Sequence, residues 1–79
     1  KNIIIKSKIE SLDTLIIAYN NSPNYTKAIK IAKLYFNKQK YDKSIKWAKK
    51  ANKLQPENYE SWYLFAKSLI KLGKITEAK

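Results

Sequence analysis

The chain contains an internal repeat with a period of about 34 residues. Trp62 stands 34 residues after Ala28, and the apolar and small residues that follow keep the same spacing at both places. An earlier segment repeats at an offset of 33. The aligned pairs are Ala28/Trp62, Ile31/Phe65, Ala32/Ala66 and Tyr35/Leu69 at the first offset, and Ser11/Ser44, Leu12/Ile45, Ala18/Ala51 and Pro23/Pro56 at the second. A fixed period of this size predicts stacked structural units rather than a globule closed around one core.

The spacing of apolar residues predicts that these units are α-helical. Apolar side chains recur at alternating intervals of three and four residues, which is typical of one face of a helix, and only one Gly and two Pro interrupt the chain. We predict helices over residues 3–20, 25–38, 42–54 and 59–72. Gly73 stands just past the fourth, where Gly favours termination, so residues 75–79 would open a fifth helix.

Length and composition exclude several classes of function. Seventy-nine residues without Cys or His form at most one small domain, with no disulfide, no thiol chemistry and no histidine ligand. The chain has no Gly-rich phosphate loop and no nucleophile elbow, so we predict a non-enzyme without cofactor, catalytic residues or metal site. No apolar run reaches the roughly 20 residues that span a bilayer. We expect a cytoplasmic protein that does not meet the membrane through this segment, and a membrane-anchored parent stays open.

The residues at the repeated positions resemble the tetratricopeptide repeat (TPR) family. Residues 25–58 resemble one full repeat, 8–23 the second helix of a preceding repeat and 59–79 a partial repeat, all within a single domain of residues 1–79. The matching positions are Ala28, Ile31, Ala32, Tyr35, Ser44, Ala51 and Pro56, then Trp62, Phe65, Ala66, Leu69, Gly73 and Ala78. The resemblance implies an all-α fold of antiparallel helix hairpins, stacked as a right-handed α-solenoid of about four helices plus the start of a fifth.

The same resemblance suggests which residues form the core. Small residues would let the helices approach closely where they cross, and Trp62, Phe65 and Tyr35 would fill the space between hairpins. The predicted crossing points are Ala32, Ala66, Ser44, Ala51 and Ala78. The family usually has an aromatic residue where this chain has Ala48, so Trp47 either fills that space or is an exposed anchor. Because repeat units bury their apolar faces only against neighbours, we also expect uncapped ends that favour a homo-oligomer, by exchange of terminal helices.

In the TPR family the first helix of each repeat lines a concave groove. Carried over to matching positions, the predicted groove residues are Ile29, Lys33, Phe36, Asn37, Glu60, Tyr63, Lys67, Ile70 and Lys71. Lys33/Asn37 and Lys67/Lys71 are spaced four residues apart, so each pair shares a helix face. The resemblance therefore implies a non-catalytic scaffold that binds an extended or helical, acidic peptide segment of another protein. The alternative is a solvated groove without a ligand.

The net charge of +11 comes from 17 Lys and no Arg against 6 acidic residues, and it is compatible with more than one role. A composition rich in Lys, Ile and Asn is typical of an AT-rich, bacterial-like genome, which alone could account for the charge. A row of lysines on the third helix could bind nucleic acid or an anionic membrane non-specifically, or could be a solvated convex face: Lys43, Lys46, Lys49, Lys50 and Lys53. Specific nucleic-acid binding is disfavoured because Arg is absent. A purely structural role in self-assembly is the third alternative.

Overall fold

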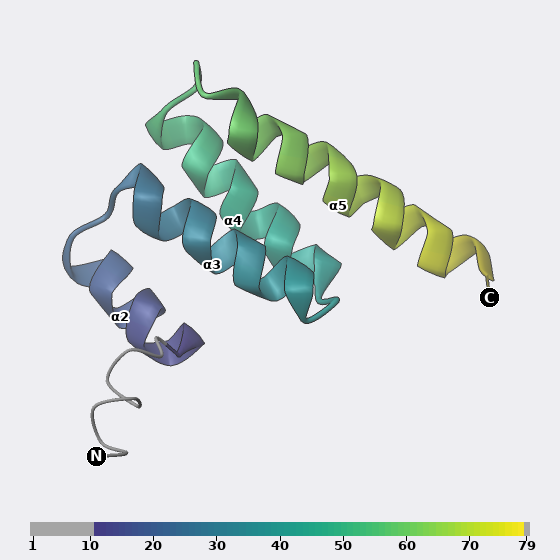
Figure 1. The fold of residues 1–79 in the computed structure, drawn as a ribbon, viewed down its shortest axis with the longest axis horizontal. Coiled ribbons are helices and arrows are strands. Elements are labelled where there is room, and N and C mark those ends of the chain that lie inside the picture. Colours follow the sequence, from purple (N-terminus) through teal and green to yellow (C-terminus); the bar gives the residue numbers. More distant parts are fainter. Residues whose placement is uncertain (1–10, 79) are drawn as a thin grey trace, which may run out of the picture.

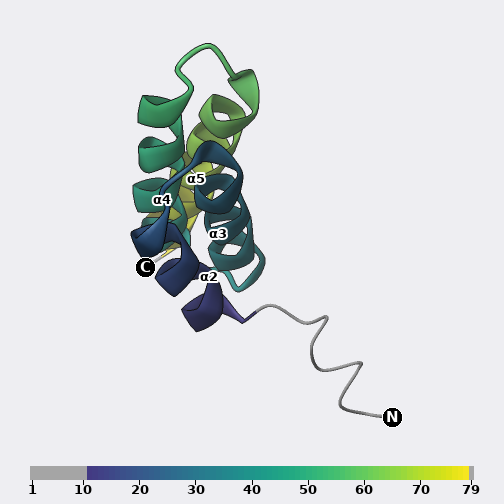
Figure 2. The same ribbon diagram turned by 90° about the vertical axis from the view of Figure 1, so that its left-hand side faces the viewer.

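A computed structural model describes residues 11–78 of the chain as a row of helices (Figure 1). Within this part the structure contains four helices and no strand, which confirms the predicted all-α class. Their bounds are α2, Leu12–Asn21; α3, Tyr25–Asn37; α4, Tyr41–Leu54; and α5, Tyr59–Ala78. Each helix packs beside the next along the chain, and α3 also contacts α5. After a turn of 90°, α4 lies on one side of the stack, and α3 with the first turns of α5 on the other (Figure 2).

Side-chain caps fix where the helices begin. Ser11 and Asn24 each accept a hydrogen bond from the backbone N–H three residues ahead, at 3.2 and 2.8 Å. Asn58 accepts one from the N–H of Glu60 at 3.0 Å. The cap at Ser11 has extended backbone angles, so the single helix predicted over 3–20 is wrong at this point, because a capping serine starts a new helix there. The earlier residues of that prediction, 3–10, lie outside the described part of the chain.

The connection between α3 and α4 is a tight turn through the left-handed region. Gln39 has a φ of 65°, and its N–H donates to the carbonyl of Phe36 at 2.9 Å. The N–H of Lys40 donates to the carbonyl of Tyr35, also at 2.9 Å. These bonds satisfy carbonyls that the end of α3 leaves without helical partners. The turn reverses the chain, so α3 and α4 form an antiparallel hairpin.

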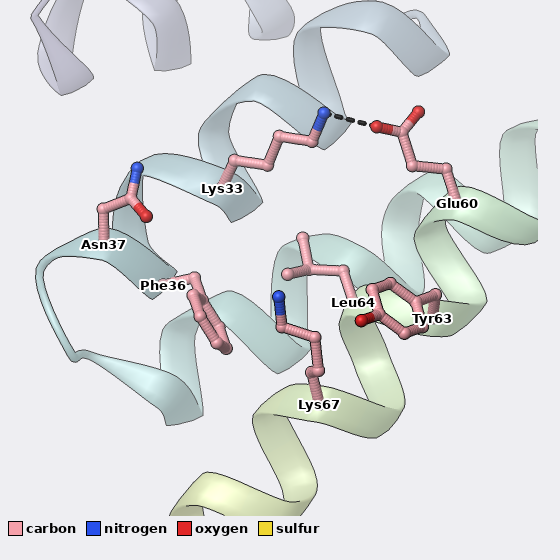
Figure 3. Close-up of a pocket in the computed structure, with 7 residues that line it drawn as sticks. All are labelled: Lys33, Phe36, Asn37, Glu60, Tyr63, Leu64 and Lys67. Carbon is pink, nitrogen blue, oxygen red and sulfur yellow. Dashed lines mark hydrogen bonds and ion pairs between the residues drawn. The ribbon is translucent and has the colours of Figure 1, made fainter.

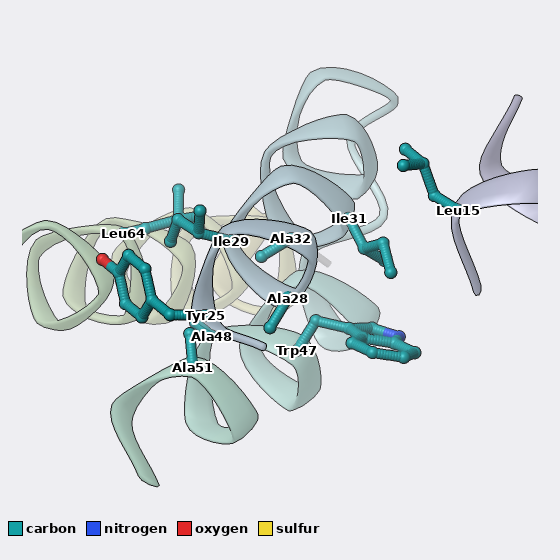
Figure 4. Close-up of a cluster of buried hydrophobic side chains, with 10 residues drawn as sticks. All are labelled: Leu15, Tyr25, Ala28, Ile29, Ile31, Ala32, Trp47, Ala48, Ala51 and Leu64. Atoms are coloured by element: carbon teal, nitrogen blue, oxygen red, sulfur yellow. The ribbon is translucent and has the colours of Figure 1, made fainter. Parts of the chain in front are cut away.

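The core runs between the helices as a continuous cluster (Figure 4). The alanines and serines at the helix crossings are fully buried, including Ala32, Ser44 and Ala51, as predicted. Trp47 is buried beside Ala48 and meets the ring of Tyr19 edge-on, with centroids 5.0 Å apart. It therefore fills the space that the small Ala48 leaves, and the alternative of an exposed anchor is wrong.

Two core expectations on α5 are wrong. Trp62 is 48% exposed and Ala66 is exposed, although both align with fully buried positions of α3. Phe65, which aligns with the fully buried Ile31, is only partly buried. The physical reason is that α4 covers this face of α3, whereas no helix among the described residues covers the matching face of α5.

The predicted helix end at Gly73 is also absent. Helix α5 continues through Gly73 to Ala78, so residues 75–78 belong to it and do not open a fifth helix. Gly73 does not have the positive φ of a terminating glycine, and a Cβ built there would meet nothing within 4 Å. Glycine costs a helix about 1 kcal/mol, but without tertiary contacts that turn the chain away this cost does not end it.

Candidate functional site: a groove between α3 and α5

The first helices of the two hairpins, α3 and α5, run in the same direction and leave a groove between them (Figures 1 and 3). The groove contains a pocket of about 300 Å³. Its lining residues are Lys33, Phe36, Asn37, Glu60, Tyr63, Leu64 and Lys67 (Figure 3). Helical spacing explains the set: residues three or four positions apart on each helix face the same side. Six of the nine residues that the sequence pointed to are thus brought together in one place.

The other three predicted groove residues lie elsewhere. Ile29 is 6% exposed and lies in the core beside Leu64, so it supports the groove from beneath rather than lining it (Figure 4). Ile70 is 58% exposed and Lys71 is exposed, and neither lines the pocket. Leu64, which the sequence did not place in the groove, lines it while being buried; its alignment with Lys30 of α3 gave no signal for this.

Lys67 occupies the aromatic side of the pocket. Its Nζ atom lies 4.8 Å from the centroid of the Phe36 ring and 5.1 Å from that of Tyr63. Phe36 is itself held edge-on against Tyr41, with centroids 5.2 Å apart. Each cation–π contact at a partly exposed site contributes about 0.5–1 kcal/mol, so the two rings hold the ammonium group over the pocket. Within the described part of the chain, no carboxylate pairs with Lys67.

Lys33 occupies the opposite side of the pocket and is already paired. Its ammonium group forms an ion pair with the carboxylate of Glu60, which joins α3 to α5 across 27 positions of sequence. The two side chains are 50% and 46% exposed, so water screens the pair and its contribution to stability is about 0–1 kcal/mol. The sequence placed both residues in the groove but did not predict that Glu60 neutralises Lys33. The charge of the pocket therefore differs from one end to the other.

A second cluster of charge covers the outer face of α4. Asp42, Lys46, Lys49, Lys50 and Lys53 line a shallow depression there. Lys50 lies over the ring of Trp47, with Nζ 5.4 Å from the centroid. The remaining lysines project from an exposed helix face, which is the usual place for long charged side chains. This arrangement alone does not define a binding site.

Other kinds of site find no support in the described part of the chain. No group of three or more acidic, His or Cys residues that could hold a metal ion occurs among residues 11–78. A search of the same residues for a helix long and apolar enough to cross a membrane finds none.

Comparison with known families agrees with the repeat architecture. Residues 5–79 match the family model described as anaphase-promoting complex, cyclosome, subunit 3, which is a family of TPR-type repeats. No curated protein and no solved structure gives a significant match to the chain. Repeats of this type are typically non-catalytic and serve as protein–protein interaction scaffolds. The match covers nearly the whole sequence, and the chain belongs to this TPR-type family.

Proposed function

We propose that the groove between α3 and α5 binds an extended or helical segment of another protein that carries acidic side chains. The observation that carries the proposal is the position of Lys67, whose ammonium group is held over two aromatic rings without a carboxylate partner among the described residues. A carboxylate from a ligand would complete a charge-assisted hydrogen bond there.

The walls of the groove support binding of an apolar residue next to the acidic one. Phe36 and Leu64 line the pocket together with the 62% exposed Tyr63. Aromatic side chains with partly exposed rings supply most of the contact energy in many protein interfaces. A ligand with an acidic residue beside an apolar one would therefore match both kinds of surface.

The ion pair between Lys33 and Glu60 adds a selective element. Glu60 already places a carboxylate in the pocket, so the groove can accommodate this group at its far end. A ligand carboxylate at Lys33 would have to compete with Glu60, whereas one at Lys67 would not. The net charge of +11 would also accelerate encounter with acidic partners at low salt.

The test is binding of a short fluorescein-labelled peptide in which Glu and Leu alternate, followed by fluorescence anisotropy. A peptide with Gln in place of each Glu serves as the ligand control. We expect Lys67→Glu with Lys71→Glu to lower affinity by at least about tenfold, because ligand carboxylates would then meet like charge. The matched control, Lys43→Glu with Lys46→Glu on α4, changes the net charge equally but leaves the groove intact.

Equal loss of affinity in both double variants would contradict the groove and favour binding by net charge alone. Random-sequence DNA is the probe for that alternative, because counterion release makes such binding fall steeply with salt. A groove ligand should instead keep a measurable preference for the Glu peptide over the Gln peptide as salt rises.

A further inference from the structure

Helix α5 presents an apolar stripe that faces away from the groove. Trp62 and Leu69 are 48% and 47% exposed, Ala66 is exposed and Phe65 is partly buried. The Trp62 ring is fixed, because its Nε1–H donates to the carbonyl of Pro56 at 2.8 Å and the ring lies perpendicular to that of Phe65. Beside the stripe lies a pocket of about 220 Å³ between α5 and α4. A fixed, exposed apolar stripe of this length is a surface on which another helix can pack.

The internal repeat shows what kind of helix fits this stripe. Its four residues align, at an offset of 34, with Ala28, Ile31, Ala32 and Tyr35 of α3. On α3 the first three of these are fully buried, and they share one core cluster with Trp47, Ala48 and Ala51 of α4. The stripe on α5 is thus the counterpart of the face of α3 that α4 covers.

Helix α2 is the segment of this chain that matches α4. At an offset of 33, Ser11, Leu12 and Ala18 repeat as Ser44, Ile45 and Ala51, so small residues stand at the same helix crossings. On α4 the face with Ser44, Trp47 and Ala51 is directed at the core it shares with α3. The matching positions of α2 include Ser11 and Thr14, which are exposed, and the adjacent Ile17 is 61% exposed.

Charge also favours α2 as the occupant. Lys49 and Lys53 line the pocket beside the stripe. Among the four described helices, α2 alone contains no lysine, and it carries Asp13 in its first turn. In a chain of net charge +11, this helix can approach the two lysines without repulsion between like charges.

We propose that α2 of a second copy of the chain packs on the stripe of α5, in the position that α4 takes on α3. The contact is head-to-tail, because it joins one end of the stack to the opposite end of the next, and it can continue from copy to copy. Asn52 gives independent support. It lines the pocket, it is 6% exposed, and its Oδ1 atom has no hydrogen-bond partner among the described residues.

The repeat predicts which side chain meets Asn52. Within one copy, Tyr19 of α2 contacts Trp47 of α4 across adjacent second helices of the stack. The same offset of 33 converts this pair into Asn52 and Thr14. At the contact between copies, the hydroxyl of Thr14 from the second copy would therefore face the Asn52 amide and can donate to its oxygen.

The test is analytical ultracentrifugation of the full chain over a series of concentrations. We expect mass to rise with concentration beyond that of a dimer, because each copy keeps one free stripe and one free α2. Ala66→Arg should raise the dissociation constant by at least about tenfold, since it places a charge in the centre of the contact. The matched control pair is Leu69→Lys and Ile70→Lys: adjacent and similarly exposed, but only Leu69 lies on the stripe.

A mixing experiment distinguishes head-to-tail contact from a symmetric one. Ala66→Arg blocks only the stripe and Thr14→Arg only α2, so each variant should be monomeric alone and their mixture should stop at a heterodimer. Circular dichroism confirms that both variants keep the helical content of the parent chain. A wild type that stays monomeric at high concentration, or Thr14→Arg that still self-associates, would overturn the proposal, as would equal effects of Leu69→Lys and Ile70→Lys.

Discussion

Ser68 on α5 donates a hydrogen bond to Ser44 on α4, with the two Oγ atoms 3.1 Å apart. Ser44 in turn donates to the backbone carbonyl of Ala32 on α3 at 2.9 Å. Both hydroxyls are fully buried. Three helices are therefore joined through two small side chains, and these side chains also permit the close approach that the bonds require.

Replacing Ser44 with Ala should lower the free energy of unfolding by about 1–2 kcal/mol, because it leaves the buried Ser68 hydroxyl without its acceptor. Urea denaturation measures the loss. The double variant with Ser68→Ala should lose less than the sum of the two single variants, since it removes both members of the pair. Strict additivity of the two losses would show that the bond between the serines contributes nothing.

Ile31→Ala should cost about 2–5 kcal/mol, because Ile31 is fully buried and its removal leaves a cavity. Phe65 occupies the matching position of α5, where the sequence alone predicts a core residue. Because it is only partly buried, Phe65→Ala should cost less than Ile31→Ala, about 1–2 kcal/mol. Urea titration at low protein concentration compares them. A larger loss for Phe65→Ala would mean that the stripe on α5 is covered in solution.

Glu60→Gln should raise affinity for the acidic peptide while changing stability by less than about 1 kcal/mol. The reason is that the variant removes the internal carboxylate that competes for Lys33. Anisotropy titration of the variant and the parent measures the gain. Combined with Lys33→Gln, the gain should disappear; a gain that persists would come from net charge rather than from release of Lys33.

Gly73→Ala should stabilise the chain by about 0.5–1 kcal/mol, because alanine has the higher helix propensity and the added Cβ meets no neighbouring atom. Thermal unfolding monitored by circular dichroism measures the change. A destabilising effect would instead indicate that Gly73 ends the helix in a left-handed conformation, as the sequence alone suggests.

The repeat offset predicted which positions are equivalent, but equivalence does not determine burial. Ala32 and Ala66 match in sequence, yet only Ala32 has a helix packed over it. Gly73 shows a related limit, because a glycine ends a helix only where tertiary contacts turn the chain away from it. In both cases the deciding factor is the presence or absence of a neighbour, which local sequence does not encode.

The candidate site shows the same division. Helical spacing correctly brought Lys33, Phe36, Glu60, Tyr63 and Lys67 to one pocket. It did not predict which lysine pairs with a carboxylate and which lies over rings, because these contacts depend on how α3 and α5 are offset along their axes.

The length of α5 has a consequence for local stability. Its 20 residues extend about 30 Å, whereas α3 and α4 with 13 and 14 residues reach only about 20 Å. The end of α5 consequently projects past its neighbours (Figure 1). A lone helical segment in water is marginally stable, so backbone amides in this projecting end should exchange with deuterium well before those in the first turns of the same helix.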